Sequence, residues 1–248
     1  MHLSLYQIAN LVFIALLLVL VLRYLWMMMV HPPDQPASWK EAMRSGSIPR
    51  TLRKLERFYP DKVRFYTWWL QVERLKKESV PGAFAELGVY QGKSARILHL
   101  MDPSRRLYLF DTFEGFPAVD LKGEEGKAST YSSGHFADTS VSIVMKKLGG
   151  GDGILLFPGY FPETVKSVNE GSFSLVSLDA DLYKPTKAGL EYFYPRLSPG
   201  GVILVHDYNP HWTGVIRAVD EFMKTIPETP VLIPDRDGTL LIIKGKKV

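Results

Sequence analysis

The sequence predicts a doubly wound α/β domain whose mostly parallel, seven-stranded sheet ends in an antiparallel C-terminal hairpin, with a single apolar helix ahead of it. The first observation is an alternation of short apolar runs with segments of helical periodicity from residue 83 onward. Strands separated by helices form parallel sheets with helices on both faces. The second is size, because 248 residues, 46% of them apolar, suffice for one full domain and a small appendage. The third is a long uncharged run near the N-terminus.

Apolar runs bounded by turn residues predict the strands, and apolar positions at helical spacing predict the helices. Arg236-Asp237-Gly238 marks the turn of the closing hairpin. Two more helices, separated by Pro60, are expected between 51 and 77, and the polar segment 117–134 is expected to be a mobile loop. The expected strands are 83–87, 107–110, 154–157, 173–178, 202–205, 231–233 and 239–244. The expected helices among them are 94–101, 140–148, 187–197 and 215–225.

The N-terminal run predicts a membrane-spanning helix. Residues 3–22 carry no charge, and residues 11–22 are apolar without a break. About 20 such residues, at ~1.5 Å rise each, cross the ~30 Å of bilayer hydrocarbon. Arg23, Tyr24 and Trp26 then suit the headgroup region. No positive segment precedes the run and no small-residue cleavage site follows it, which disfavours a signal peptide. A helix docked on the domain or on a partner is the alternative.

The charges that flank this run predict its orientation. No lysine or arginine precedes it, and the positive-inside rule then places the folded domain on the cytoplasmic side of a single-pass membrane protein. The expected organisation is a transmembrane helix at 1–30, a linker at 31–50 and one domain at 51–248 with an N-terminal helical cap. Prolines make residues 31–36 a stiff part of the linker. The positive residues after the run are Arg23, Lys40, Arg44, Arg50, Arg53, Lys54 and Arg57.

The composition excludes several kinds of site and partner. The chain has no cysteine, so disulfide frameworks, thiolate metal sites and cysteine nucleophiles are excluded. The formal net charge of +4 is small, and the excess gathers in the N-terminal third. This favours a membrane surface over nucleic acid as a partner. The helices expected between 51 and 77 are candidate contacts of a homo-oligomer.

The end of the first strand predicts a nucleoside-binding site. Glycines at 88 and 92 allow the backbone to turn sharply and to approach a ligand closely. The N-terminus of the helix that follows offers free N–H groups to a carboxylate. Asp111, after the second strand, stands where an acid binds ribose hydroxyls in this architecture. A glycine pair alone would indicate only a turn, but the pair, its context and the spaced acid together indicate a site.

The glycine spacing bears on which cofactor binds. The third glycine of G-x-G-x-x-G is absent, because Lys93 stands at that position and the spacing is G-x-x-x-G. Glu86 leads the motif, and its charge would repel a pyrophosphate, whereas a sulfonium ligand has no phosphate to repel. The motif therefore favours S-adenosylmethionine. A nicotinamide-dependent oxidoreductase is the alternative within the same fold.

Five segments stand in the order of the motifs of one known family. They are 80–92, 111–117, 158–164, 178–183, and 200–201 leading to 206–208. On these segments the chain resembles the macrocin O-methyltransferases, the TylF and MycF-like family of metal-dependent sugar O-methyltransferases, across roughly residues 57–244. The apolar helix lies outside the resemblance. The resemblance implies a small hydroxylated acceptor and the cofactor S-adenosylmethionine. The candidate residues that bind this cofactor are Glu86, Gly88, Tyr90, Gly92, Asp111, Thr112, Gly159 and Tyr160.

Three aspartates are the candidates for catalysis. Methyl transfer to an alcohol is an in-line displacement, so the enzyme must place an oxygen and help to remove its proton. A divalent cation (magnesium or manganese) lowers the pKa of a bound hydroxyl, and magnesium prefers carboxylate oxygens. Asp179 and Asp181 follow the fourth strand and Asp207 follows the fifth, at the edge where such sheets bind ligands. The resemblance implies Asp179 and Asp207 as metal ligands, and Asp181 as the general base or an additional ligand.

Position 206 departs from the family's pattern. A pair of aspartates is expected before Tyr208, but the first of the two positions is His206. An imidazole can ligate a metal with Asp179 and Asp207, yet it suits zinc, iron or manganese better than magnesium. The identity of the metal, and its presence, are therefore open. His206 is also a candidate catalytic base, because its ordinary pKa is near neutrality.

Two other interpretations compete with this one. An aspartate after a strand is often only the N-cap of the next helix, and Asp181 stands where it could cap one. A catalytically silent membrane-anchored module, which holds a nucleoside or recruits a partner, is the rival function. The replacement at His206 supports the silent module, whereas the retained Glu86, Asp111 and Asp179 count against it.

Overall fold

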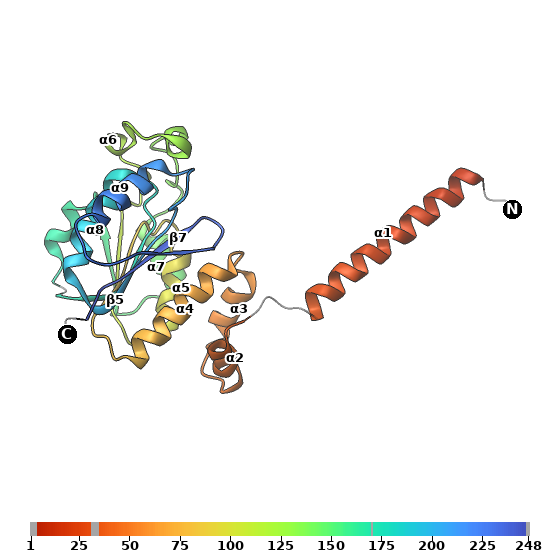
Figure 1. Cartoon of the computed structure of the whole chain (residues 1–248), viewed down its shortest axis with the longest axis horizontal. Coiled ribbons are helices and arrows are strands. Elements are labelled where there is room, and N and C mark those ends of the chain that lie inside the picture. Colours follow the sequence, from red (N-terminus) through yellow and green to blue (C-terminus); the bar gives the residue numbers. More distant parts are fainter. Residues whose placement is uncertain (1–3, 31–34, 170, 247–248) are drawn as a thin grey trace. The chain divides into compact units, whose positions relative to one another are not determined.

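The chain divides into two compact units, 1–45 and 46–248. The computed structural model describes residues 4–30, 35–169 and 171–246, with the backbone alone at 28–30. The first unit contains α1 (Leu5–Val30), whose stretch Leu5–Met27 is long and apolar enough to cross a membrane and has no residue buried in the protein (Figure 1). It also contains α2 (Ala37–Arg44), which lies inside the segment expected to be linker. Most of the stiff stretch predicted at 31–36 falls outside the described residues.

The second unit contains the seven-stranded sheet that the sequence predicted, and its strand order is β3-β2-β1-β4-β5-β7-β6. The first five strands along the chain pair in parallel, and β7 pairs antiparallel with both β5 and β6. The chain winds outward from β1 to β3 and then returns to add β4 on the other side of β1. The carboxyl ends of β1 and β4 therefore form the switch point where such sheets bind ligands. The strands are β1 (Ala83–Leu87), β2 (Leu107–Asp111), β3 (Ile154–Pro158), β4 (Phe173–Leu178), β5 (Leu197–Val205), β6 (Val231–Ile233) and β7 (Thr239–Ile243).

Helices cover both faces of this sheet (Figure 1). In one group α5 packs against both α4 and α7, and in the other α8 packs against α9. Every residue of β1 and β4 is buried, which is expected of parallel strands covered on both sides. Phe193 of α8 is fully buried in the main core with Ala85 and Val176 of the sheet. The helices are α3 (Arg50–Phe58), α4 (Lys62–Lys77), α5 (Lys93–Met101), α6 (Ala118–Leu121), α7 (Val141–Leu148), α8 (Tyr183–Arg196) and α9 (Thr213–Met223).

Two differences from the predicted elements bear on the site. The segment 117–134, expected to be an unstructured loop, contains α6 and a 3-10 helix at Gly126–Thr130. Both are too short to show helical periodicity in a sequence. Helix α8 begins at Tyr183, four residues before its predicted start, and carries Pro185 in its first turn. Proline is tolerated there because the first N–H groups of a helix have no intrahelical partner.

Candidate active site

The carboxyl ends of β1, β2, β4 and β5 surround a cavity of about 450 Å³. This volume lies within the range of roughly 300–1,000 Å³ that is usual for small-molecule sites. The glycine loop at 88–91 lines one part of the cavity, and the acids that follow β4 and β5 line another. The structure therefore brings the predicted nucleoside-binding and catalytic segments to one site. The predicted residues that line it are Gly88, Tyr90, Asp111, Thr112, Gly159, Tyr160, Asp179, Asp181, His206 and Asp207.

The loop after β1 is held by close backbone contacts. Gly88 has a φ of +88°, and a Cβ atom there would lie 1.8 Å from the carbonyl oxygen of Asp179. Only glycine lets β1 and β4 end so close together. Asp111 accepts hydrogen bonds from the N–H groups of Val89 and Tyr90 on Oδ2, at 2.7 and 2.8 Å. Its Oδ1 accepts from the N–H of Phe113 at 2.7 Å. Asp111 thus orders the loop itself, in addition to any contact with a ribose.

Two of the predicted cofactor residues do not line the cavity. Gly92, with a φ of +72°, ends the loop and precedes the first turn of α5. Glu86 is fully buried within β1, where burial raises its pKa to about 8 although a hydrogen bond with Ser94 lowers it. Glu86 is therefore a mostly neutral acid near pH 7. The sequence analysis used a negative charge on Glu86 as an argument against a pyrophosphate. Burial largely removes this charge, so that argument is weakened.

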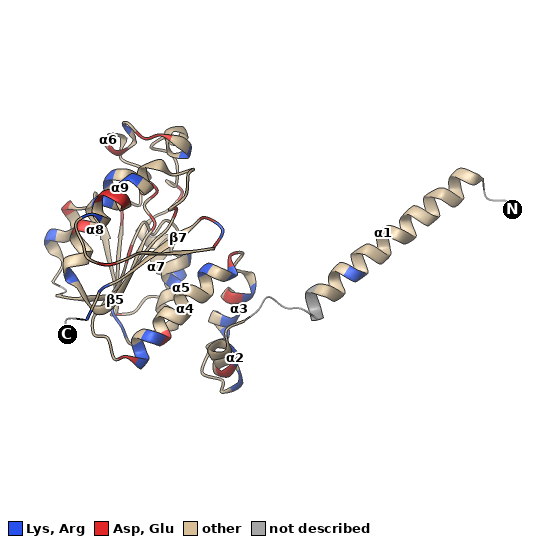
Figure 2. Cartoon of the chain, viewed as in Figure 1, with Lys and Arg blue, Asp and Glu red and all other residues tan. Residues whose placement is uncertain are grey.

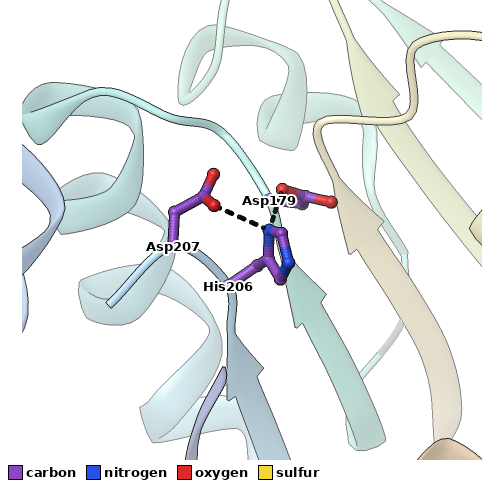
Figure 3. Close-up of side chains that lie close together, drawn as sticks. All are labelled: Asp179, His206 and Asp207. Carbon is purple, nitrogen blue, oxygen red and sulfur yellow. Dashed lines mark hydrogen bonds and ion pairs between the residues drawn. The ribbon is translucent and has the colours of Figure 1, made fainter. Parts of the chain in front are cut away.

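Asp179, His206 and Asp207 form a compact cluster (Figure 3), with one ligand atom of each within 4.8 Å of the others. Asp179 directly follows β4, and His206 and Asp207 directly follow β5. His206 Nδ1 lies 3.0 Å from Asp179 Oδ1 and 3.1 Å from Asp207 Oδ1. The ring nitrogen thus lies within hydrogen-bonding distance of two carboxylates at once.

Arg64 completes the cluster, and sequence reasoning missed it. Its Nη2 lies 2.8 Å from Asp179 Oδ2, across 115 positions of the sequence. Arg64 stands in the first turn of α4, where its N–H donates to the N-cap Asp61 at 3.0 Å. Its guanidinium lies over the ring of Trp68, 4.8 Å from the centroid. The available signal was an arginine in a helix where four of the next five residues are aromatic.

The charges of the cluster set the pKa values of its members. Burial alone would lower the pKa of His206, but Asp179, by charge and hydrogen bond, and Asp207 raise it to about 10. Burial alone would raise the pKa of Asp179, but His206 and Arg64 hold it well below its usual range. Burial and the neighbouring carboxylates of Asp179 and Asp207 raise the pKa of Asp181 well above its usual value. Asp181 therefore binds a proton more tightly than an ordinary aspartate does.

The capping interpretation of Asp181 is wrong. The N-cap of α8 is Leu182, and no side chain caps that helix end. Strand β4 ends at Leu178, so the strand alternation that would place Asp179 and Asp181 on one side does not extend to them. Asp181 instead adopts a left-handed backbone conformation, with a φ of 59°, and lines the cavity with Asp179.

The residues fit the cofactor better than they fit a metal. The cavity has the volume for a nucleoside, and an ordered glycine loop borders it. The metal donors, in contrast, are committed to one another: Arg64 takes one oxygen of Asp179 and His206 takes the other. An Nδ1 that faces two carboxylate oxygens must carry a hydrogen and cannot ligate a metal, although Nε2 of the same ring is buried without a hydrogen-bond partner among the described residues. The arrangement of Nδ1 and Asp179 does not fit a divalent cation.

Aromatic side chains form a further wall of the cavity, which the sequence did not predict. Phe116 and Tyr131 stack with ring centroids 5.2 Å apart, and Phe136 lies edge-on to Phe116 at 5.5 Å. All three line the cavity, as does Trp212. Tyr131 belongs to the segment that was expected to be a mobile loop. The wall therefore depends on that segment being folded.

Such a fold, with a glycine loop and an acid cluster at the switch point, defines the doubly wound, nucleoside-binding class of methyltransferases. The macrocin-O-methyltransferase (TylF) family matches residues 62–238, and the chain belongs to this family. The resemblance inferred from the sequence is thereby confirmed.

Relatives of known function are O-methyltransferases. The chain is 30% identical over 148 residues to 8-demethyl-8-(2,3-dimethoxy-alpha-L-rhamnosyl)-tetracenomycin-C 4'-O-methyltransferase of Streptomyces olivaceus, covering 55% of this chain and 57% of that one. It is 30% identical over 150 residues to mycinamicin III 3''-O-methyltransferase of Micromonospora griseorubida, covering 55% and 59%. The matched part thus spans less than two thirds of either relative. The solved structure of the O-methyltransferase NovP superposes with a TM-score of 0.66 at 25% identity, covering 75% of this chain and 81% of that one.

Proposed function

We propose that this protein is an S-adenosylmethionine-dependent O-methyltransferase that methylates a hydroxyl group of a sugar or a sugar-bearing natural product. The observation that carries the proposal is the single cavity in which the glycine loop and Asp181 meet. One wall suits a nucleoside, and the other offers a carboxyl group with a raised pKa. Membership of the macrocin-O-methyltransferase family supports the same conclusion.

The residues that would hold the cofactor are those of the loop and of the adjoining strand ends. Gly88 and Tyr90 border the cavity between β1 and α5, and Asp111 and Thr112 border it at the end of β2. Tyr160 lines it after β3, where its hydroxyl donates to Asp120 at 3.0 Å. S-adenosylmethionine, when bound, supplies a methyl group that is already activated by the positive sulfur.

The chemical step requires one proton acceptor from the protein. The acceptor hydroxyl gives its proton to Asp181, and its oxygen forms a bond to the methyl carbon as the sulfur–carbon bond breaks. Neutral S-adenosylhomocysteine and a methyl ether are the products. Because burial and two neighbouring carboxylates raise the pKa of Asp181, it accepts this proton more readily than an ordinary aspartate would.

The acceptor class follows from the aromatic wall and from the relatives. Phe116, Tyr131 and Trp212 line the same cavity as the acids and give it aromatic surface, and sugars combine an apolar face with polar edges. Two relatives are named as O-methyltransferases of rhamnosyl-tetracenomycin and of mycinamicin. A sugar hydroxyl on a larger molecule fits both observations.

We place this activity at the cytoplasmic face of a membrane. Helix α1 is long and apolar enough to span a bilayer, and positive residues follow it in the chain (Figure 2). Arg50, Lys54 and Arg57 are exposed on α3 at helical spacing, and Phe58 beside them is 67% exposed. Basic side chains with an exposed aromatic ring suit the anionic headgroups of the cytoplasmic leaflet. A membrane-partitioned acceptor would suit this location.

Calorimetric titration of the full chain in detergent with S-adenosylhomocysteine tests the proposal. Saturable binding is expected. Substitution Asp111→Asn should weaken it about tenfold or more, because it perturbs hydrogen bonds to a charged group that orders the loop. Asp152→Asn, in an exposed turn, is the matched control and should bind as the unsubstituted chain does.

Turnover is tested with methyl α-L-rhamnoside as a probe acceptor and a methyl-labelled donor. Transfer that Asp181→Asn abolishes, with binding of S-adenosylhomocysteine retained, supports the assigned base. Failure of the unsubstituted chain to bind S-adenosylhomocysteine would refute the methyltransferase function and leave the silent module as the better interpretation.

A further inference from the structure

An arginine, a histidine and two acids contact one another at the end of the sheet. Asp179 contributes both carboxylate oxygens, one to Arg64 at 2.8 Å and one to His206 at 3.0 Å. His206 Nδ1 also lies 3.1 Å from Asp207 (Figure 3). These contacts join α4 to the ends of β4 and β5, and the side chains of Arg64 and His206 are only 11% and 10% exposed.

The position of Nδ1 fixes one property of His206 without reference to pH. A nitrogen lone pair pointed at two carboxylate oxygens at these distances would be repelled by both. A hydrogen on Nδ1, shared between the oxygens, is attracted by both. His206 therefore donates to Asp179 and Asp207, where an aspartate at position 206 would instead add a third carboxylate.

Arg64 is held in place independently of His206. Its backbone N–H donates to the N-cap Asp61, and its guanidinium lies over Trp68. An arginine keeps its charge at any pH at which the protein is folded. Its guanidinium pairs with Oδ2 of Asp179, which leaves this carboxylate less negative charge to attract a further cation.

We propose that Arg64 and His206 take the place of a divalent cation in this site, so that methyl transfer by this chain is independent of metal. The network orients Asp179 and neutralises the acids around the acceptor, as a bound cation would. The proton of the acceptor hydroxyl still goes to Asp181, so the atoms and charges balance without an added ion. The catalytic part of this inference rests on the proposed function, whereas the statement about metal binding does not.

Titration of the full chain in detergent with Mn²⁺, followed by electron paramagnetic resonance, tests the inference directly. The unsubstituted chain should leave the free Mn²⁺ signal unchanged, and EDTA should leave the rate of methyl transfer unchanged. His206→Asp removes the Nδ1–H donor and creates a pair of adjacent carboxylates. It should bind Mn²⁺ at least about tenfold more tightly, the scale on which changes around a metal site act.

His211→Asp is the matched control, because it adds a carboxylate in the exposed loop that follows the cluster, outside the network. It should not gain Mn²⁺ binding. Stoichiometric binding of Mn²⁺ by the unsubstituted chain, weakened by Asp179→Asn, would overturn the inference, as would a rate abolished by EDTA and restored by Mg²⁺. The Mn²⁺ titration of the unsubstituted chain tests the inference even if a substituted chain fails to fold. Loss of S-adenosylhomocysteine binding, in contrast, would refute the proposed function and leave the metal result standing.

Discussion

At the scale of single residues, backbone conformations that side chains rarely adopt gather at the cavity. Tyr90, Phe136, Asp181 and Asp207 have φ values of 50°, 58°, 59° and 63°, and all four line the cavity. Such conformations cost of order 1–3 kcal/mol each and persist only where the surroundings enforce them. No periodicity or motif predicts them, because they arise from contacts between loops that lie far apart in the sequence.

Gly88 provides a test of how closely the strand ends must meet. A Cβ atom at Gly88 would lie 1.8 Å from the carbonyl oxygen of Asp179, at a φ of +88°. We expect Gly88→Ala to destabilise the fold by about 3 kcal/mol or more, since a left-handed alanine and a backbone clash add together. For a domain of this size that lowers Tm by roughly 6–12 °C, measured by circular dichroism.

Gly149 is a matched control for this substitution. It has the same φ of +88°, but a Cβ atom there would meet nothing within 4 Å. Gly149→Ala should therefore cost only about 1 kcal/mol, the usual penalty of a left-handed alanine. Equal losses in the two variants would show that conformation alone, and not the approach of Asp179, makes the glycine at 88 necessary.

The sequence predicted those residues of the candidate site that directly follow a predicted strand. Asp179 and His206 stand directly after predicted strands, so topology alone brought them to one edge of the sheet. Arg64 could not be found this way, because the position of α4 over the site depends on side-chain packing across the whole domain. The departure at His206 was visible in the sequence, but its meaning required the arginine.

At the scale of elements, regular periodicity was predictable and short irregular helices were not. Strands β1 and β4 have the predicted bounds, because both are continuous apolar runs ended by turn residues. The segment 117–134 is polar, and its two helices are too short to show helical periodicity in the sequence. Tertiary contacts hold it instead, including a hydrogen bond of 2.8 Å from the N–H of Lys127 to the carbonyl of His211.

Glu124 links this segment to the start of α8. Its Oε1 accepts a hydrogen bond of 2.7 Å from the N–H of Tyr183, the first residue of the helix, where Leu182 offers no cap. Glu124→Ala should cost about 1 kcal/mol, as loss of a helix cap does, and lower Tm by roughly 2–4 °C. Glu124→Gln keeps an acceptor oxygen and should retain most of the stability.

Hydrogen exchange at the N-terminus of α8 distinguishes this role from a general loss of stability. Glu124→Ala should expose the N–H of Tyr183 to faster exchange, while β1 and β4 keep their protection relative to global stability. Glu125→Ala, at the neighbouring exposed position, should change neither quantity. An unchanged Tm and exchange rate in Glu124→Ala would show that the contact does not stabilise the helix start.

At the scale of the whole molecule, an apolar helix and an enzyme fold stand in one chain. The match to the family begins at residue 62, well after α1 ends at Val30. The helix is therefore an addition to the domain that the family defines. An α1 without a charged face has no polar side to present to water, which favours a bilayer as its surroundings.

The proposed membrane location predicts a specific extraction behaviour. The full chain in membranes of cells that express it should resist alkaline carbonate, which removes peripheral proteins. The double variant Leu16→Arg/Val19→Arg places two charges near the middle of Leu5–Met27. Each arginine costs roughly 2.5–3.5 kcal/mol at the centre of a span, so this variant should appear in the soluble fraction. Tyr6→Arg, near the end of the helix, can reach the interface and should remain with the membrane.

If the unsubstituted chain is extracted as readily as the double variant, α1 does not span the bilayer. Docking of this helix on another protein then becomes the better explanation of its apolar surface.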